Sequence, residues 1–230
     1  MIAENISDAI NMAEFAEGAT IGIKDVFLVH QSVTCGASYT HRGQIVHGAN
    51  FSAGQIGHLR VAESLLVCSC GRTDCLNSHV SGWSILANLG RVKSQKFEAE
   101  NIETYAKALA ELVDENPDQN TVEGETLFRA GQRLGETLQQ VALIVDPQAI
   151  VVAGKLSEAS AYVAGCQSVW ADRAATSQFT PPKLIVGQVA TIRAAGFLAL
   201  GRFVYSPQLM IDGLIDAAVQ SSKELNRVSR

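Results

Sequence analysis

The alternation of apolar and polar positions predicts a strand-rich segment near the start of the chain. Residues 24–33, KDVFLVHQSV, are apolar and β-branched, which is typical of a buried strand. A second strand is expected over residues 36–41, and Arg42-Gly43 is expected to turn the chain into a third strand at residues 44–46. Residues 57–61 are a candidate continuation. Together these segments predict a β-meander.

Helical periodicity dominates the rest of the sequence. The clearest case is residues 123–145, where apolar residues return at steps of seven, four, three and four, as on one face of a helix. An earlier helix is expected over residues 8–16, with Ser7 or Asp8 as its cap. Helices that alternate with short apolar strands predict parallel β-α units, so the expected class is an α/β fold with the β-meander at its front. The other expected elements are helices over residues 79–89, 101–115, 157–173, 192–204 and 208–226 and strands over residues 150–153 and 183–186.

Composition and charge narrow the class of protein. Of the 230 residues, 47% are hydrophobic and 18% are charged, which is ordinary for a packed globule of one or two domains. The 18 Lys and Arg against 23 Asp and Glu give a net charge of −5, which argues against binding of nucleic acid by this chain itself and against a basic membrane-surface protein. No apolar run approaches the roughly 18 residues of a membrane span, and the start, MIAENISDAI, has no basic leader. We therefore expect a protein of the cytosol.

The cysteines are distributed unevenly. Three of the five, Cys68, Cys70 and Cys75, fall within eight residues, whereas Cys35 and Cys166 are isolated. An odd count with tight clustering argues against a disulfide framework. The isolated pair is interpreted as small buried hydrophobes, and the cluster is a candidate metal site.

The spacing H-x9-C-x-C-x4-C adds His58 to the three cysteines. Three thiolates and one imidazole are the ligands of a closed tetrahedral zinc site, and Gly71 allows a tight turn around an ion. His79 competes with His58 as the fourth ligand because it stands only four residues after Cys75. The alternative is a cysteine cluster that binds no metal, and spacing alone does not separate these possibilities.

The same residues resemble the signature of the ROK family of repressors and sugar kinases. The run HGANFSAGQIGHLRV, followed by CSCGRTDCLNSHVSG, is similar to the family's G-A-x-G-E-I-G-H and C-x-C-G-x-x-G-C-L-E segments. VDPQAIVVAGKL resembles its D-P-x-x-I-V-x-G-G run, TIRAAGFLAL its closing helix of small residues, and ENISDAINMAEFAEG its E-N-D helix. The resemblance covers about residues 3–205. It implies that His58, Cys68, Cys70 and Cys75 bind zinc and that His79 does not.

The resemblance also implies the architecture. The family fold is a two-lobed, actin-like ATPase of the ribonuclease H-like type, and residues 1–205 correspond to its second lobe, with a zinc loop at residues 57–78. Complete members carry a first lobe before this point, and repressors also carry a winged helix-turn-helix; neither is expected in this chain. Residues 206–230 are expected to form a C-terminal helix or tail that packs against a second copy of the chain or is poorly ordered.

Departures from the family pattern bear on function. The family's kinases take the proton from the sugar hydroxyl with the acid of E-N-D, and Ile6 stands at that position, so this role is lost. Asp8 is a poor substitute because two residues on a helix turn it roughly 200° away. The family's phosphate loop, G-T-G-I-G-G-G, aligns with Ser32–Ser38, where one glycine remains, and its adenine-side glycines align with residues 153–155, AGK.

Sugar binding requires fewer residues than phosphoryl transfer. The resemblance implies that Asn5, Gln55, His58 and Asn77 provide polar groups to a sugar, with Gln55 and Asn77 replacing family glutamates. We therefore expect a non-catalytic sugar-sensing and dimerisation domain of a transcriptional regulator with structural zinc, which reaches DNA only through a region absent from this chain. The alternatives are a degenerate sugar kinase that phosphorylates a hexose from ATP and an oligomerisation scaffold without a ligand.

Overall fold

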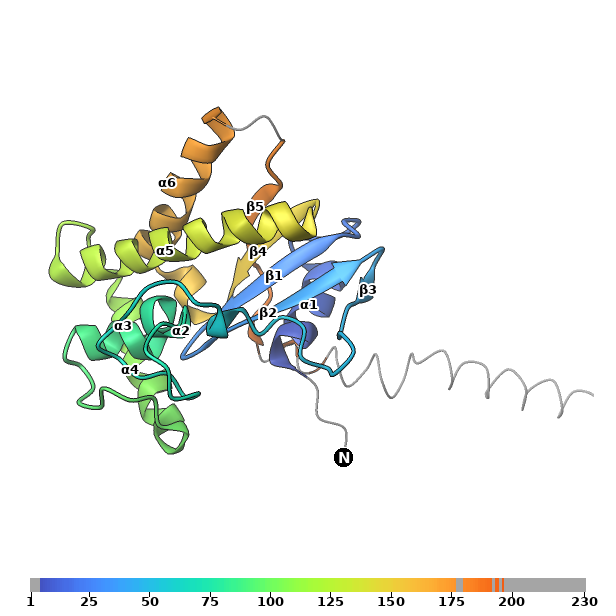
Figure 1. Ribbon diagram of the computed structural model, residues 1–230. Coiled ribbons are helices and arrows are strands. Elements are labelled where there is room, and N and C mark those ends of the chain that lie inside the picture. The colour runs from blue at the N-terminus through green and yellow to red at the C-terminus, as the bar shows by residue number, and fades with distance from the viewer. Residues whose placement is uncertain (1–4, 177–179, 192, 195, 197–230) are drawn as a thin grey trace, which may run out of the picture.

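The computed structural model describes residues 5–176, 180–191, 193, 194 and 196, and its centre is a five-stranded mixed sheet (Figure 1). The strand order is β3-β2-β1-β4-β5, in which β1 pairs antiparallel with β2 and parallel with β4. The β-meander and the parallel β-α units that the sequence predicts therefore share one sheet. The elements are α1 (Ile6–Glu17), β1 (Val26–Gln31), β2 (Cys35–His41), β3 (Gln44–Ile45), η1 (Ile56–His58), α2 (Asn77–Val80), α3 (Gly82–Asn88), η2 (Ala99–Asn101), α4 (Ile102–Glu115), α5 (Val122–Val145), β4 (Ala149–Ala153), η3 (Lys155–Glu158), α6 (Ser160–Thr176) and β5 (Lys183–Val186).

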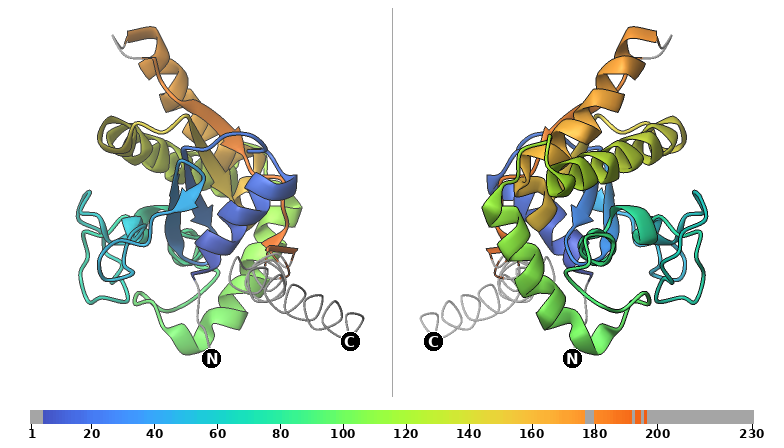
Figure 2. Two further views of the ribbon diagram at one scale, coloured as in Figure 1. Left: turned by 90° about the vertical axis from the view of Figure 1, so that its right-hand side faces the viewer. Right: turned by 90° about the vertical axis from the view of Figure 1, so that its left-hand side faces the viewer.

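Side-chain alternation along the central strands creates a core on each face of the sheet. Phe27 and Val29 of β1 face the larger core, which also contains buried side chains of α3, α4, α5 and α6. Val26 and Leu28 face a smaller core with Ala9, Ile10 and Ala13 of α1. The sheet is thus sandwiched between α1 on one side and α5 and α6 on the other (Figure 2).

The first helix begins earlier than its predicted cap. Asn5 is the N-cap of α1, and its side chain accepts a hydrogen bond from the backbone N–H of Ser7 at 3.0 Å. Ser7 and Asp8, the predicted caps, lie inside the helix and are buried. The prediction of the cap was wrong because three of the four residues 5–8 have a side chain capable of capping, and only packing against the sheet chooses among them.

Three other boundaries differ from the predictions. Residues 57–61 do not extend the meander, because Ile56–His58 form a 3-10 helix and the only pairing nearby is an isolated bridge between Arg60 and Cys75. The helix expected over residues 79–89 is two helices, α2 and α3, separated at Ser81, whose side chain caps α3. The helix expected over residues 157–173 begins as the 3-10 helix η3.

The long periodic helix agrees closely with its prediction. α5 ends at Val145, followed by Asp146 in the left-handed conformation with φ of 47°, before Pro147. Among the helices that the structure describes, none has the length and apolar character needed to cross a bilayer. The expected helices over residues 192–204 and 208–226, and the tail at residues 206–230, lie wholly or mostly outside the described residues.

Candidate functional site

Short turns carry the four residues of the zinc motif. His58 is the last residue of η1. Cys68 and Cys70 lie on a turn closed by a hydrogen bond from the Cys68 backbone N–H to the carbonyl of Arg72 at 2.8 Å, with Gly71 at a φ of +89°. Cys75 returns the chain to Arg60 through a β-bridge. Backbone bonds therefore place three separate segments around one point.

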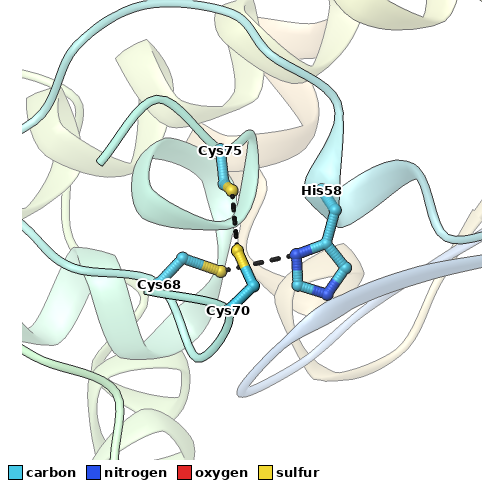
Figure 3. A group of neighbouring side chains, drawn as sticks. All are labelled: His58, Cys68, Cys70 and Cys75. Carbon is cyan, nitrogen blue, oxygen red and sulfur yellow. Dashed lines mark hydrogen bonds between the residues drawn. The ribbon is translucent and has the colours of Figure 1, made fainter. Parts of the chain in front are cut away.

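The ligand atoms of His58, Cys68, Cys70 and Cys75 all lie within 4.8 Å of one another (Figure 3). The Cys68 sulfur is 3.6 Å from His58 Nδ1, and the Cys70 and Cys75 sulfurs are 3.4 Å apart. Ligands of a tetrahedral zinc ion, at about 2.3 Å for sulfur and 2.0 Å for nitrogen, lie about 3.5–3.8 Å from one another. The residues therefore fit a metal ion of this type.

The charges around the cluster favour thiolates. Arg72 donates a hydrogen bond through Nη2 to the Cys75 sulfur at 3.3 Å and to the His58 carbonyl, and Asp74 pairs with both Arg72 and Arg60. A hydrogen bond from the Arg72 backbone lowers the pKa of Cys70, whereas burial raises the pKa of Cys75 to about 11. A bound cation would overcome that burial, because metal ligation removes the thiol proton.

His79 is not part of this cluster. Its Nε2 lies 2.9 Å from the carbonyl oxygen of Ala62, which can only accept, so Nε2 carries the proton. His58, and not His79, is the histidine that the fold brings to the three cysteines. Cys35 and Cys166 are buried away from the cluster, and burial raises the pKa of each thiol to about 12, which confirms their interpretation as buried hydrophobes.

The segments that contain the predicted sugar-binding residues meet at the start of β2. The backbone N–H of Cys35 donates to Asn77 Oδ1 at 2.7 Å, and Ala37 N–H donates to the Gly54 carbonyl at 2.8 Å. A side chain at Gly36 would lie 3.2 Å from the hydroxyl of Ser7. The first three residues of β2 thus contact the start of α1, the loop before η1 and the start of α2.

Two glycines permit this close packing. A Cβ at Gly54 would collide with the Ala37 carbonyl, and the φ of Gly54 is +85°. A Cβ at Gly57 would collide with the carbonyl of Cys35 and lie 2.6 Å from Asn77 Nδ2. These contacts explain why glycines flank Gln55 and Ile56 in this sequence.

The predicted sugar-binding residues differ in their availability. Gln55 is exposed, and His58 is half-buried with Nδ1 directed to the cysteines. Asn77 is buried, and its carbonyl oxygen is engaged by Cys35. Asn5 caps α1. The structure therefore brings Gln55, His58 and Asn77 to one region, while Asn5 and Asn77 also serve the fold.

The next residues surround the position that the resemblance assigns to the family's catalytic base. Ile6 opens α1 and is 40% exposed, and its side chain has no proton acceptor. Asp8 is buried, and its Oδ2 lies 3.5 Å from His47 Nδ1. The sequence had indicated neither the pairing of Asp8 with His47 nor the tilted contact between the rings of His47 and Phe51, because both depend on how the loop after β3 folds.

The turn aligned with the phosphate loop packs against α3. The carbonyl of Ser32 accepts the backbone N–H of Gly82 at 2.8 Å, and that of Val33 accepts the N–H of Trp83 at 3.1 Å. Val33 itself is buried in the larger core. A valine side chain thus fills part of this turn, which the resemblance aligns with the family's glycine-rich phosphate loop.

Comparison with known proteins supports the family resemblance that the sequence indicates. A family model described as the ROK family matches residues 1–200. The chain belongs to the ROK family. The N-acetylglucosamine repressor NagC of Escherichia coli is 24% identical over 213 residues, which cover 90% of this chain and 50% of that protein. A glucokinase of Halalkalibacterium halodurans is 27% identical over 164 residues, which cover 69% of this chain and 50% of that enzyme.

A solved structure of a ROK family transcriptional regulator, a homologue of the E. coli MLC protein, has the same fold. It superposes with a TM-score of 0.66 at 18% identity, covering 84% of this chain and 50% of that one. The actin-like ATPase fold expected from the sequence is therefore confirmed. This ROK chain spans about half the length of the curated relatives it matches, and these include both repressors and sugar kinases.

Proposed function

We propose that this chain is the sugar-binding and dimerising lobe of a non-catalytic ROK-family transcriptional regulator, stabilised by a structural zinc ion. The observation that carries the proposal is Ile6, which occupies the position of the family's catalytic base with an exposed hydrocarbon side chain. General base catalysis requires a proton acceptor within hydrogen-bond reach of the sugar hydroxyl. In this proposal, DNA binding belongs to a region outside the chain.

The surroundings of Ile6 support the loss of catalysis. The nearest acidic residue along the helix, Asp8, is buried, and its Oδ2 lies 3.5 Å from His47 Nδ1. The turn at Ser32–Ser38 retains Gly36 alone among the family's glycines, and the backbone N–H of Cys35 is already bonded to Asn77. Phosphoryl transfer depends on positioned phosphates, so the loss of the base and of the glycine loop point the same way.

Sugar binding has separate support. Gln55 offers an exposed amide beside His58, and the hydrogen bond from Cys35 to Asn77 Oδ1 fixes the start of α2 close to them. Zinc, when bound by His58, Cys68, Cys70 and Cys75, would hold this loop in one conformation, because a closed site of four protein ligands is structural. The proposed regulator therefore keeps polar groups for a sugar and four candidate zinc ligands, although it lacks the family's base and glycine loop.

Calorimetric titration of the full-length protein with a panel of hexoses and amino sugars tests the proposal. We expect saturable binding of one sugar class, weakened about tenfold by Gln55→Ala, since a lost hydrogen bond of about 1.4 kcal/mol corresponds to that factor. Gln119→Ala, which alters an exposed glutamine in the loop before α5, is the matched control and should bind normally. Binding that is insensitive to Gln55→Ala would place the sugar elsewhere.

The second candidate is a degenerate sugar kinase, favoured by the similarity to glucokinases. Ile6→Asp restores a carboxylate at the family position of the base and distinguishes the two. A large gain in ATP-dependent sugar phosphorylation would indicate a surviving phosphate site and favour the kinase, whereas no gain favours the regulator. A complete absence of heat with every sugar would favour the third candidate, an oligomerisation scaffold.

A further inference from the structure

A cavity of about 330 Å³ lies between the zinc loop and α5, and none of the proposed sugar-binding residues lines it. α2 and α5 contact each other here, so the walls come from segments far apart in the sequence. The volume lies at the lower end of the range for small-ligand sites. Its polar walls include Ser64, Ser78, His79, Thr126, Arg129 and Arg133.

The charge of this cavity is opposite to that of the chain. Arg129 and Arg133 stand one turn apart on α5 and both line the cavity, and none of its described lining residues is acidic. The chain as a whole carries a net charge of −5. Two guanidinium groups that share one cavity are an arrangement suited to an anion, although each also pairs with a glutamate of its own helix.

The existing ion pairs leave both arginines able to bind. Arg129 pairs with Glu125 at 2.6 Å, and Arg133 pairs with Glu136 at 3.0 Å, each within α5. The arginine side chains are 73% and 56% exposed. Exposed pairs of this type contribute little free energy, so a ligand inside the cavity competes with them easily.

A buried hydroxyl group provides an independent sign of a ligand. Ser78 is 1% exposed, and its Oγ has no hydrogen-bond partner among the described residues although it lines the cavity. Buried hydroxyls almost always have a partner, because leaving one unbonded costs free energy. The neighbouring Ser64 does not satisfy it, since the Ser64 hydroxyl lies 3.4 Å from the carbonyl of Ser78 instead.

We propose that this cavity is a binding site for a phosphoryl group, contacted by the guanidinium groups of Arg129 and Arg133 and by the hydroxyl of Ser78. Arginine binds phosphate oxygens through paired N–H groups, and a serine hydroxyl donates to a third oxygen. The ligand is either inorganic phosphate or the phosphate of a small phosphorylated metabolite. The site is independent of the sugar-binding role proposed above.

Titration calorimetry of the full-length protein with inorganic phosphate, in a buffer free of other oxyanions, tests the site. We expect one saturable event per chain, weakened about tenfold or more when Arg129→Gln and Arg133→Gln are combined. Ser78→Ala should weaken binding several-fold without lowering the melting temperature, because its hydroxyl bonds nothing in the described structure. A drop in the melting temperature of Ser78→Ala without any effect on phosphate would overturn the assignment.

The control is Lys107→Gln, which removes one positive charge from an exposed position on α4 outside the cavity. If phosphate does not saturate, or if Lys107→Gln weakens binding as much as the arginine pair, the site does not exist. Titrations with a phosphorylated sugar and with its unphosphorylated form show whether a phosphorylated metabolite can provide the phosphoryl group. If the two arginine substitutions weaken binding of the phosphorylated sugar, the site is supported. If only Gln55→Ala weakens that binding, the site is contradicted for that ligand.

Discussion

The side chain of Asn77 accepts a hydrogen bond from the backbone N–H of Cys35 at 2.7 Å, and this bond joins the start of α2 to the start of β2. Both partners are buried. The resemblance places Asn77 where the family's motif has a sugar-binding glutamate, and its side chain here stabilises the fold. The bond therefore couples the geometry of the zinc loop to the sheet.

Replacing Asn77 separates these two roles. Asn77→Ala leaves the Cys35 N–H buried without a partner, so we expect the free energy of unfolding to fall by about 1–3 kcal/mol. Asn77→Asp keeps an acceptor oxygen and should be closer to the wild type. Chemical denaturation measures both, with Gln119→Ala as an exposed control. A wild-type stability for Asn77→Ala would show that the bond contributes nothing.

Glu14 joins the first helix to the segment after β5. Its buried carboxylate accepts backbone N–H groups from Gln188 at 2.6 Å, Val189 at 2.7 Å and Ala19 at 2.7 Å. Glu14→Gln replaces one acceptor oxygen by an NH2 group that faces a donor, so we expect a loss of about 2–3 kcal/mol. Hydrogen exchange at residues 188 and 189 should accelerate.

The matched control for that experiment is Glu17→Gln, one turn further along α1. Glu17 is exposed and pairs only with Arg193 in the described structure. Glu17→Gln should leave hydrogen exchange at residues 188 and 189 unchanged. Equal acceleration by both variants would indicate a general weakening of α1 instead of the loss of specific bonds.

We expect His30 on β1 to make the free energy of unfolding sensitive to acid. Burial lowers its pKa from 6.5 to about 4, so between these values the unfolded chain binds a proton that the folded chain does not. Stability should therefore fall as the pH decreases from about 6.5 towards 4, by at most about 3 kcal/mol from this residue. Unfolding free energies of the wild type and His30→Gln, compared at pH 7 and pH 4.5, measure it. A parallel pH dependence in both would refute this role.

The metal prediction concerns the zinc content of the protein and the competition between protons and the metal. Elemental analysis should find about one zinc ion per chain, and Cys70→Ser should reduce that content strongly. Cys166→Ala, which removes a buried thiol outside the cluster, should retain the metal. Burial raises the pKa of Cys75 to about 11, so protons compete with the metal and retention should weaken as the pH falls. A folded, metal-free wild-type protein in which Cys68, Cys70 and Cys75 are free thiols would contradict the prediction.

The sequence indicated the architecture well where the signals were local. Apolar periodicity located α5 and β4 to within a residue or so, and the cysteine spacing identified the cluster that the fold assembles. Sequence spacing alone could not decide whether His58 or His79 joins the cysteines, because both histidines lie within reach of Cys75 along the chain. It depends on the hydrogen bond between His79 and Ala62, which is a tertiary contact.

Contacts over long sequence distances were not predictable from local patterns. Two of the three partners of Glu14 lie more than 170 residues away in the chain, and the two arginines of the phosphate cavity come from a helix whose exposed face resembles any other charged surface. The unbonded hydroxyl of Ser78 becomes visible only when burial and hydrogen bonding are known together. Sequence patterns specify which faces are buried, but tertiary packing decides which polar atoms meet.

The most direct test of the regulator interpretation is phosphoryl transfer itself. The full-length wild-type protein, supplied with zinc, MgATP and the sugar that it binds most tightly, should show saturable sugar binding and no formation of sugar phosphate above the uncatalysed rate. The physical reason is that Ile6 provides no acceptor for the proton of the sugar hydroxyl. Steady formation of a sugar phosphate by the wild-type protein would contradict the account and establish a kinase with a different base.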